Sequence, residues 1–418
     1  MMRSVFTANG ATSSALRALN YSPITERFKR VKEGRKVIPL RDLLQDLGEA
    51  WGTVFTRVDC DPKYGVNLLS QVDVFSSEPE GRSIRRDSMP RPDRHLIRKW
   101  QVLLSGAGQM GESTLFGRAI IADDRLAGKY VGPDSVVMSL AEPEADLSLY
   151  AYAFLLTEAG TLAVKSCAYG TSIPRVRLDL LGSMLIPIAT DHDIARVASF
   201  VRATVAARED YYRHVKLARA ALEHLPEMQH AISLCGERKA RCVVWNRELP
   251  TLCAWNVAST GGALAFLKRN WKARLGDILQ DDGVFNGPRF ARISCKQPYG
   301  IDFYSQRDLF LIRRVPRRIV HPGFNDDLLF VPEGSLLIGG HGTLGEGEIF
   351  GRVVYVSGRL SRAGFTQDLL RVIPRVGMSA LAYTFLSSQV GFRLLRSTGV
   401  GTKLLMMRTD LLSVPATE

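Results

Sequence analysis

The chain of 418 residues contains no stretch approaching the ~18 consecutive apolar residues that a membrane-spanning helix needs, so the sequence excludes a membrane span. Hydrophobic residues nevertheless make up 46% of the chain, which is too many for a globally disordered protein. The sequence therefore predicts a folded globular protein, and its length is natural for two domains.

Metal-binding patterns are also missing. The six cysteines include no C-x-x-C pair, and the seven histidines form no pair with metal-ligand spacing. Cys235, Cys242 and Cys253, near His224 and His230, allow a loose zinc site. Free thiols in a reducing cytosol are the favoured interpretation, so we expect a cytoplasmic protein without a bound metal.

Signatures of catalysis are absent as well. There is no G-x-x-x-x-G-K-[ST] string for ATP, and no Asn-Pro-Pro-aromatic or Asp-Pro-Pro-aromatic tetrapeptide of an amino-methyltransferase. No restriction-type nuclease centre is evident either. We therefore expect a non-catalytic protein that needs no cofactor and leaves any chemistry to a partner.

Two G-x-G-x-x-G strings are the exception to that pattern of absences. A dinucleotide site requires such glycines to open a helix inside a βαβ unit. Here strand-like residues follow both strings, so we interpret them as glycine-rich turns between strands. A dinucleotide-binding enzyme stays as the alternative function on these residues: Gly106, Gly108, Gly111, Gly340, Gly342 and Gly345.

Basic residues are in excess. The chain has 55 Lys and Arg against 42 Asp and Glu, a net charge of +13. Such a surplus concerns partners more than fold, and it favours a polyanion. Nucleic acid is the first candidate.

The chain also repeats itself. Tyr64-Gly65 recurs 235 residues later as Tyr299-Gly300, and Ser70-Gln71 recurs as Ser305-Gln306. The string LLSGAGQMGESTLFGRAII, which starts at residue 103, is echoed by LIGGHGTLGEGEIFGRVVY from residue 337. Gly170-Thr171 returns as Gly401-Thr402 near the end. Landmarks in one order with nearly constant spacing indicate a tandem duplication rather than a short-period solenoid.

Each copy has strands first and helices later. WQVLLSG and FGRAIIA have the pattern of strands, while Asp42 and Asp277 mark short helices. Apolar residues at helical spacing predict helices over 147–165 and 378–396. This is an α+β pattern rather than alternating βαβ units.

A different segment lies between the copies. Residues 190–225 contain neither Gly nor Pro, and Thr190 followed by Asp193 is typical of a helix start. An imperfect heptad stripe runs from Ile194 through Val197, Val201 and Thr204. We expect a coiled-coil-like spacer helix at 190–226, between domains at 1–189 and 227–418.

The order of these features resembles the specificity subunits of Type I restriction–modification systems. In that family a target recognition domain ends in Gly-Thr, then basic and leucine residues, then an apolar-Pro segment that leads into a long helix. This chain has those elements as YGTSIPRVRLDLLGSMLIPIA from Tyr169, and again as Gly401-Thr402 to Val414-Pro415. The family usually carries a second long helix after the second domain; here the matched segment ends near Glu418, so we expect a partner's helix or a smaller docking surface.

The resemblance implies two target recognition domains, each a mixed β-sheet with helices, that read the two different halves of a bipartite double-stranded DNA target. It further implies a partner adenine methyltransferase and, in restricting systems, a restriction/translocase subunit; methylation-linked phage defence without restriction is the alternative. The candidate DNA-binding residues are Arg82, Arg85, Arg86, Arg91, Arg94, Lys99, Arg175, Arg289, Arg292, Lys296, Arg313, Arg314, Arg317, Arg318 and Lys403.

For two further sets of residues, the sequence leaves two roles open. Ser70-Gln71 and Ser305-Gln306 are either polar groups that read an adenine or strand residues that face solvent. Arg118 and Arg352 occupy matching places in the two copies. For these arginines a scaffold role, such as pairing with Asp179 or Asp410, is at least as strong an interpretation as DNA contact.

Overall fold

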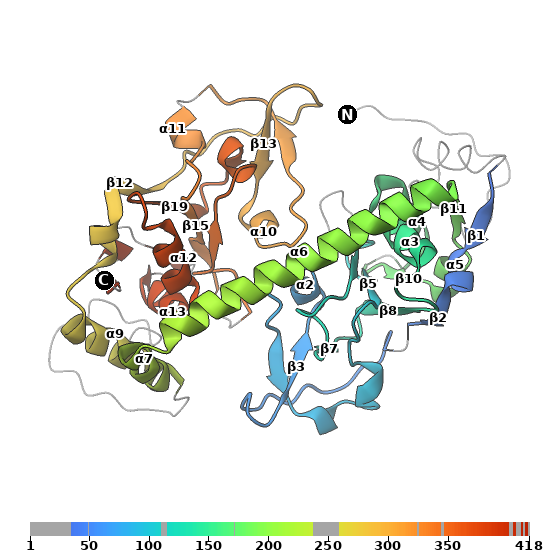
Figure 1. Ribbon diagram of the computed structural model, residues 1–418, viewed down its shortest axis with the longest axis horizontal. Coiled ribbons are helices and arrows are strands. Elements are labelled where there is room, and N and C mark those ends of the chain that lie inside the picture. Colours follow the sequence, from blue (N-terminus) through green and yellow to red (C-terminus); the bar gives the residue numbers. More distant parts are fainter. Residues whose placement is uncertain are drawn as a thin grey trace. The chain divides into compact units, whose positions relative to one another are not determined.

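The fold is described from a computed structural model of the chain. It covers residues 35–48, 50–109, 115–170, 172–236, 259–323, 326–343, 347–400, 404–406, 411–412 and 414–416. The chain forms two compact units, Met1–Tyr212 and Arg213–Glu418, and the division falls within the long helix α6 (Figure 1).

Unit one is built on a four-stranded antiparallel sheet. Its strand order is β2-β8-β5-β6, with β2 at Leu44–Leu47, β8 at Ser135–Leu140, β5 at Val102–Ser105 and β6 at Ala119–Ile121. A second sheet has the order β4-β3-β7, in which β3 pairs antiparallel with β4 and parallel with β7. The strands of this second sheet are β3 (Val66–Leu69), β4 (Arg82–Ile84) and β7 (Tyr130–Val131). Two further sheets have two strands each and pair β1 (Val37–Pro39) with β11 (Leu185–Pro187), and β9 (Ala168–Tyr169) with β10 (Arg175–Val176).

Unit two repeats this plan. Its four-stranded antiparallel sheet has the order β12-β19-β15-β17, and its three-stranded sheet β14-β13-β18 again combines one antiparallel and one parallel pair. The same strand order in both units is what a tandem duplication predicts, so the chain is α+β as expected. The strands are β12 (Leu279–Asn286), β13 (Ile301–Tyr304), β14 (Arg317–Ile319), β15 (Leu336–Gly339), β16 (His341–Gly342), β17 (Val353–Tyr355), β18 (Gly364–Phe365), β19 (Leu369–Pro374), β20 (Gly399–Val400) and β21 (Leu404–Met406).

The two long helices predicted at 147–165 and 378–396 are each two shorter helices. Unit one has α3 (Asp146–Leu156) and α4 (Glu158–Ser166), bent by 81°. Unit two has α12 (Ser379–Ser387) and α13 (Gln389–Ser397). The break falls where Thr157 or Ser388 caps the second helix by accepting a hydrogen bond from a glycine N–H. The prediction of one uninterrupted helix was therefore wrong, because the apolar pattern continues across the cap.

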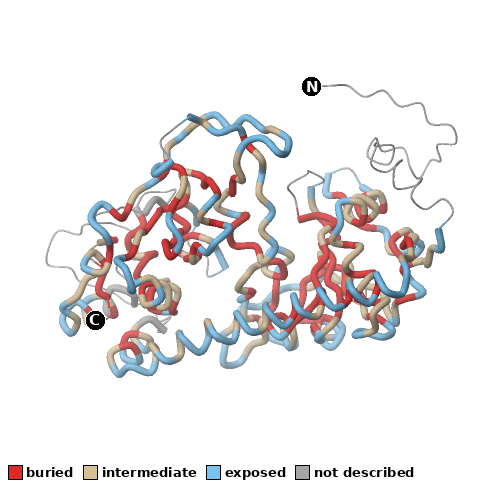
Figure 2. The backbone as a smooth tube through the Cα atoms, turned by 45° about the horizontal axis from the view of Figure 1, so that its top comes forward, coloured by how far each residue is buried: buried red, intermediate tan, exposed pale blue. Residues whose placement is uncertain are grey.

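The predicted interdomain helix is present as α6 (Asp191–Glu223), and the Asp193 N–H donates to the Thr190 hydroxyl over 3.2 Å as expected. Its inward-facing residues repeat at spacings of four and three, but not in the predicted register. Ala198 and Val205 are buried together with the predicted positions Ile194 and Val201, whereas the predicted position Thr204 is exposed. Most of the helix surface is exposed or half-buried (Figure 2).

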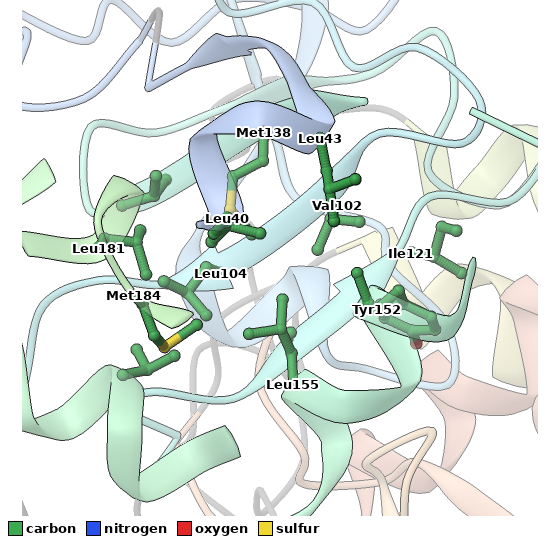
Figure 3. Close-up of a cluster of buried hydrophobic side chains, with 14 of the residues drawn as sticks. Leu40, Leu43, Val102, Leu104, Ile121, Met138, Tyr152, Leu155, Leu181 and Met184 are labelled. Carbon is green, nitrogen blue, oxygen red and sulfur yellow. The ribbon is translucent and has the colours of Figure 1, made fainter. Parts of the chain in front are cut away.

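Each unit has its own hydrophobic core. In unit one, Val102 and Leu104 of β5 face Leu40, Tyr152 and Leu155 (Figure 3), and Ala198, Val201 and Val205 of α6 join the same cluster. In unit two, the core also takes in Met228 and Leu267, from α7 (Pro226–Gly236) and α9 (Ser259–Asn270). Full burial of one such large apolar side chain stabilises the folded state by about 1.5–3 kcal/mol. These contacts therefore hold the first half of α6 on the core of unit one, and α7 and α9 on the core of unit two.

Short helical turns complete the connections. At Asp42 and Asp277 the chain forms single 3₁₀ turns, η2 (Leu40–Leu43) and η5 (Leu275–Ile278), that lead directly into β2 and β12. The expected short helices are thus only one turn long. The other turns are α2 (Gln71–Val74), η3 (Arg86–Ser88), η4 (Pro92–Arg94), α5 (Leu178–Gly182), α10 (Gln306–Leu309), α11 (Asp326–Leu329) and η6 (Leu360–Arg362).

Candidate nucleic-acid interface

The glycine strings lie between antiparallel strands, as predicted. β5 pairs with β6 and β15 pairs with β17, each antiparallel. Gly108 and Gly342 have φ values of 134° and 157°, a region that suits glycine, while Gly111 and Gly345 lie outside the described residues. A strand that returns directly does not provide the helix N-terminus on which a dinucleotide fold holds pyrophosphate.

Ser70-Gln71 and Ser305-Gln306 are not strand residues that face solvent; they form the starts of two short helices. Each serine is the N-cap of a short helix and forms a capping box with an aspartate three residues later. Gln71 donates to the Ser105 hydroxyl and to the Ala107 carbonyl, the latter over 2.9 Å. Gln306 donates to the His341 carbonyl over 2.7 Å. Both glutamines therefore fasten a helical turn to the start of the glycine-rich turn.

Three arginines of the first basic cluster are paired with acids. Arg82 bonds both carboxylate oxygens of Asp59, at 2.8 and 2.6 Å. Arg85 pairs with Asp87, and this contact raises the pKa of the arginine and lowers the pKa of the carboxyl.

Arg86 donates to the Tyr130 hydroxyl at 3.2 Å and to Asp93 at 2.8 Å. The bond to Tyr130 is the main cause of its raised pKa. The side chains of Arg82, Arg85 and Arg86 remain more than half exposed. Exposed ion pairs are weak, so a phosphate can replace the carboxylate in each of these three pairs.

Arg91 and Arg94 differ from these three. They lie at and in the turn η4, are exposed, and make no side-chain hydrogen bond or ion pair with any residue that the structure describes. Arg91 has a φ of 54°, a left-handed conformation that is uncommon for a residue with a side chain. Such conformations gather at binding and catalytic sites.

Lys99 reaches the long helix. Its ammonium lies 2.8 Å from Glu209 of α6 and 3.0 Å from Asp124, and its pKa is raised mainly by the bond to Glu209. Next to it, Trp100 has a φ of 69°, where the second copy has Gly334 with a φ of 86°. Lys99 thus ties α6 to unit one.

Arg175 lies on β10. Its guanidinium is 5.9 Å from the ring of Trp51 and 3.4 Å from Asp134. It is more than one-third exposed, so a phosphate remains within reach.

The second basic cluster, in unit two, also contains side chains that are bonded within the protein. Arg318 is anchored by Asp302 at 2.8 Å and by the carbonyls of Pro298 and Tyr299. Arg314 donates to the Leu309 carbonyl over 2.8 Å, and Arg292 donates to Gln367 over 2.8 Å. These side chains hold loops in place.

Three candidates of unit two point into solvent without a partner. Arg289, Lys296 and Arg313 are exposed and make no side-chain contact within the described part of the chain. Arg317 is exposed on β14. Lys403 lies outside the described residues, as do Asp410 and the cysteines Cys242 and Cys253 of the weak zinc pattern.

Asp179, one of the acids considered for Arg118, is bonded to Arg177. Arg352 donates to the Glu348 carbonyl over 3.0 Å and lies 5.1 Å from the ring centroid of Phe392. These contacts suit a scaffold role for Arg352, while the acid considered for it, Asp410, lies outside the described residues.

A buried charge network escaped sequence reasoning. Asp123 and Arg125 form an ion pair at 2.9 Å with neither side chain exposed, and Arg208 of α6 lies 3.4 Å from the same carboxylate. Arg125 also donates to the carbonyls of Ser76 and Ser77. Nothing in the string IADDR signals burial, because Arg208 is far away in the sequence.

Two general searches of the described residues gave little. No single described helix is long and apolar enough to cross a membrane; only α3 and α4 taken together meet that test, across their bend. No group of three or more His, Cys, Asp or Glu residues in the same part of the chain is arranged to hold a metal ion.

Comparison with known proteins gave matches among solved structures alone. No protein-family model and no curated protein matches the chain. A crystal structure of a Type-I restriction-modification system S subunit from M. genitalium matches with 12% identity over 91% of this chain and 83% of that one, at a TM-score of 0.32. An HsdS subunit from Thermoanaerobacter tengcongensis matches with 14% identity over 92% and 85%, at 0.26.

A third structure is described as the structural basis of complex assembly and conformational transition of the type I R-M system. It matches with 15% identity over 92% of this chain and 86% of that one, at a TM-score of 0.28. These matches fall in the family that the sequence motifs resemble. A TM-score below 0.5 does not establish a common fold, so the function must be argued from the chain's own residues.

Proposed function

We propose that this chain is a non-catalytic specificity subunit that binds an asymmetric, bipartite duplex DNA target, with one half-site for each unit. The internal duplication carries this proposal: two units with the same strand order are connected through one continuous helix. Because the two copies differ in their loops, their half-sites should differ too.

The unpaired cations are the best candidates for first contact with DNA. Arg91 and Arg94 in unit one, and Arg289, Lys296 and Arg313 in unit two, are free to neutralise phosphates without breaking an internal bond. Arginine can also bind a guanine edge bidentately in the major groove. The acid-paired arginines would act in a supporting role, because each must first lose its carboxylate.

Helix α6 is proposed as the element that fixes the gap between half-sites. Its 33 residues rise about 50 Å, more than one turn of B-DNA at ~34 Å. The buried contacts of Ile194, Ala198, Val201 and Val205, together with Lys99 and Glu209, would fix its direction relative to unit one.

The chemistry would come from partners. We propose an adenine methyltransferase as the obligatory partner and a restriction/translocase subunit as a further one. A system that only methylates, as in phage defence without cutting, would use the same DNA-binding subunit in the same way.

Mapping of modified adenines tests this directly. The chain would be co-expressed with its methyltransferase, and the genome of the host sequenced for methylated bases. We expect a split motif with a fixed gap and two unlike halves. A contiguous motif, or no chain-dependent methylation, would refute the proposal.

Charge variants then assign the half-sites. Arg91→Ala/Arg94→Ala should relax recognition of one half, and Arg289→Ala/Lys296→Ala/Arg313→Ala that of the other. Each lost phosphate contact should make the negative slope of log K against log salt shallower by about 0.9. The control Arg196→Ala/Lys216→Ala, on α6, removes as much charge as the unit-one variant and should leave both halves unaffected. Equal loss at both halves in either test variant would contradict modular recognition.

A further inference from the structure

The loop before β3 in unit one and its copy before β13 in unit two retain the same residues. Between residues 60–84 and 295–319, nine positions are identical. Neighbouring positions have diverged, so an identity calls for a physical reason. The identical pairs are Cys60 and Cys295, Tyr64 and Tyr299, Gly65 and Gly300, Ser70 and Ser305, Gln71 and Gln306, Asp73 and Asp308, Phe75 and Phe310, Arg82 and Arg317, and Ile84 and Ile319.

Seven of these pairs have an internal role. The Ser, Asp and Gln pairs form the capping boxes and the bonds to the glycine-rich turns. The Phe and Ile pairs are buried. A Cβ on Gly65 would collide with the Cys60 sulfur, and one on Gly300 with the Cys295 sulfur. Packing and hydrogen bonding therefore account for these seven.

The tyrosines have no such role. Tyr64 is 75% exposed and Tyr299 is 73% exposed, and neither hydroxyl makes a hydrogen bond within the described residues. The ammonium of Lys63 lies 5.4 Å from the centroid of the Tyr64 ring. Two diverged copies thus keep a large aromatic ring in water.

Both rings are carried on loops held by the same backbone bonds. The Tyr64 N–H donates to the Asp61 carbonyl over 2.9 Å, and the Tyr299 N–H donates to the Lys296 carbonyl over 3.0 Å. Each loop is also pinned to the adjacent strand through a cysteine N–H, Cys60 to Ser83 and Cys295 to Arg318. A ring on a pinned loop loses little entropy when it binds a partner.

Basic residues border each tyrosine. Lys63 precedes Tyr64, and Arg85 and Arg86 follow the paired strand β4. In unit two, Lys296 lies three residues before Tyr299 and is unpaired in the described chain. Asp59 and Asp61 reduce the charge in unit one, although Asp59 is already bonded to Arg82. An exposed aromatic ring beside cations suits a nucleic acid, whose bases stack on rings while cations bind its phosphates.

We propose that Tyr64 and Tyr299 are DNA-contacting residues, and that each stacks on a base at a step of the duplex that binding partly unstacks, within the half-site of its own unit. This rests on the proposed function. Truncation of the ring should then weaken binding by roughly 5- to 150-fold, the range for loss of one stacked base.

The test measures affinity of the full chain, in complex with its methyltransferase, for a 40-base-pair duplex that carries the mapped target. Tyr64→Ala and Tyr299→Ala should each weaken binding within the stated range without changing the salt slope, because no phosphate contact is lost. Tyr64→Phe and Tyr299→Phe should bind within threefold of the wild type, since the ring remains. Tyr211→Ala, at an exposed tyrosine of α6, is the matched control and should have no effect.

A duplex with one half-site randomised separates the two rings. On it, the tyrosine of the unit that has lost its half-site should no longer matter, whereas the other should keep its full effect. Alanine variants that bind within twofold of the wild type, or phenylalanine variants that lose as much as alanine ones, would overturn the proposal while DNA recognition stands. Failure of the wild-type complex to bind the duplex would overturn the proposed function itself. Because both rings are exposed, unchanged melting temperatures should confirm that the variants are folded.

Discussion

The buried pair of Asp123 and Arg125 offers a sharp test, because the duplication supplies its own control. Arg125 is fully buried, whereas the residue at the same place in unit two, Arg359, is 73% exposed and only 3.7 Å from Asp302. The same substitution, Arg to Met, can therefore be made at a buried and at an exposed copy of one position.

Arg125→Met removes the guanidinium that pairs with the buried Asp123 carboxylate and donates to the Ser76 and Ser77 carbonyls, and leaves that carboxylate with Arg208 at 3.4 Å and the backbone N–H of residue 125 at 3.1 Å. Breaking a buried ion pair in this way costs about 3–5 kcal/mol, because a charge stays behind without its partner. Arg359→Met should cost less than about 1 kcal/mol, as for other exposed pairs. The double variant Asp123→Leu/Arg125→Met should recover only part of the loss, because Arg208 then stays largely buried without the carboxylate that it faced.

Hydrogen exchange is the suitable measurement, because a chain of two units need not unfold in one step. Amides of β5 report on unit one and amides of β15 on unit two. Arg125→Met should accelerate exchange in β5 by about two to three orders of magnitude or more, and leave β15 unchanged. Equal and small effects of both Met variants would refute the idea that burial decides the cost.

Two further results are expected. Gly391→Ala should lower the melting temperature, because its Cβ would overlap the Phe385 carbonyl at the α12–α13 break, at a cost of about 1–3 kcal/mol. Gly358→Ala is the control and should leave the melting temperature unchanged, since a Cβ there meets nothing within 4 Å. Equal melting temperatures of the two variants would contradict the role of the break. Burial raises the pKa of the Cys167 thiol to about 11, so at pH 8 this thiol stays protonated and should resist iodoacetamide until the protein unfolds. Mass spectrometry of the native protein would measure the labelling rate at each cysteine. Labelling of Cys167 as fast as that of half-buried Cys60 would contradict this expectation.

The sequence was informative wherever a feature is local. The glycine-rich turns, the helix start at Thr190 and the order of strands before helices all follow from short patterns that the structure retains. The break between α3 and α4 was equally local, as Thr157 lies three residues before Gly160, but the continuing apolar pattern concealed it. A Ser or Thr three residues before a Gly, found in both copies, was the available signal.

The basic clusters could not be resolved in the same way. Arg85 and Asp87 are two residues apart, so their pairing was foreseeable, but Arg82 pairs across 23 residues with Asp59. Lys99 finds Glu209 more than a hundred residues away. Whether a cation is free or occupied depends on such distant partners, so a linear reading identifies the cluster and misses which members are available.

The glutamines at the two glycine-rich turns have a consequence for how such a protein can change. Gln71 and Gln306 fasten the turn after β3 or β13 to the chain just beyond β5 or β15. The segments in between, residues 76–101 and 311–335, are held at both ends, and among their described residues only β4 and β14 pair with the sheet strands β3 and β13. Under the proposed function, the exposed loops outside β4 and β14 can therefore change by mutation or recombination while the sheet strands keep their pairing, so a change of DNA target need not endanger folding.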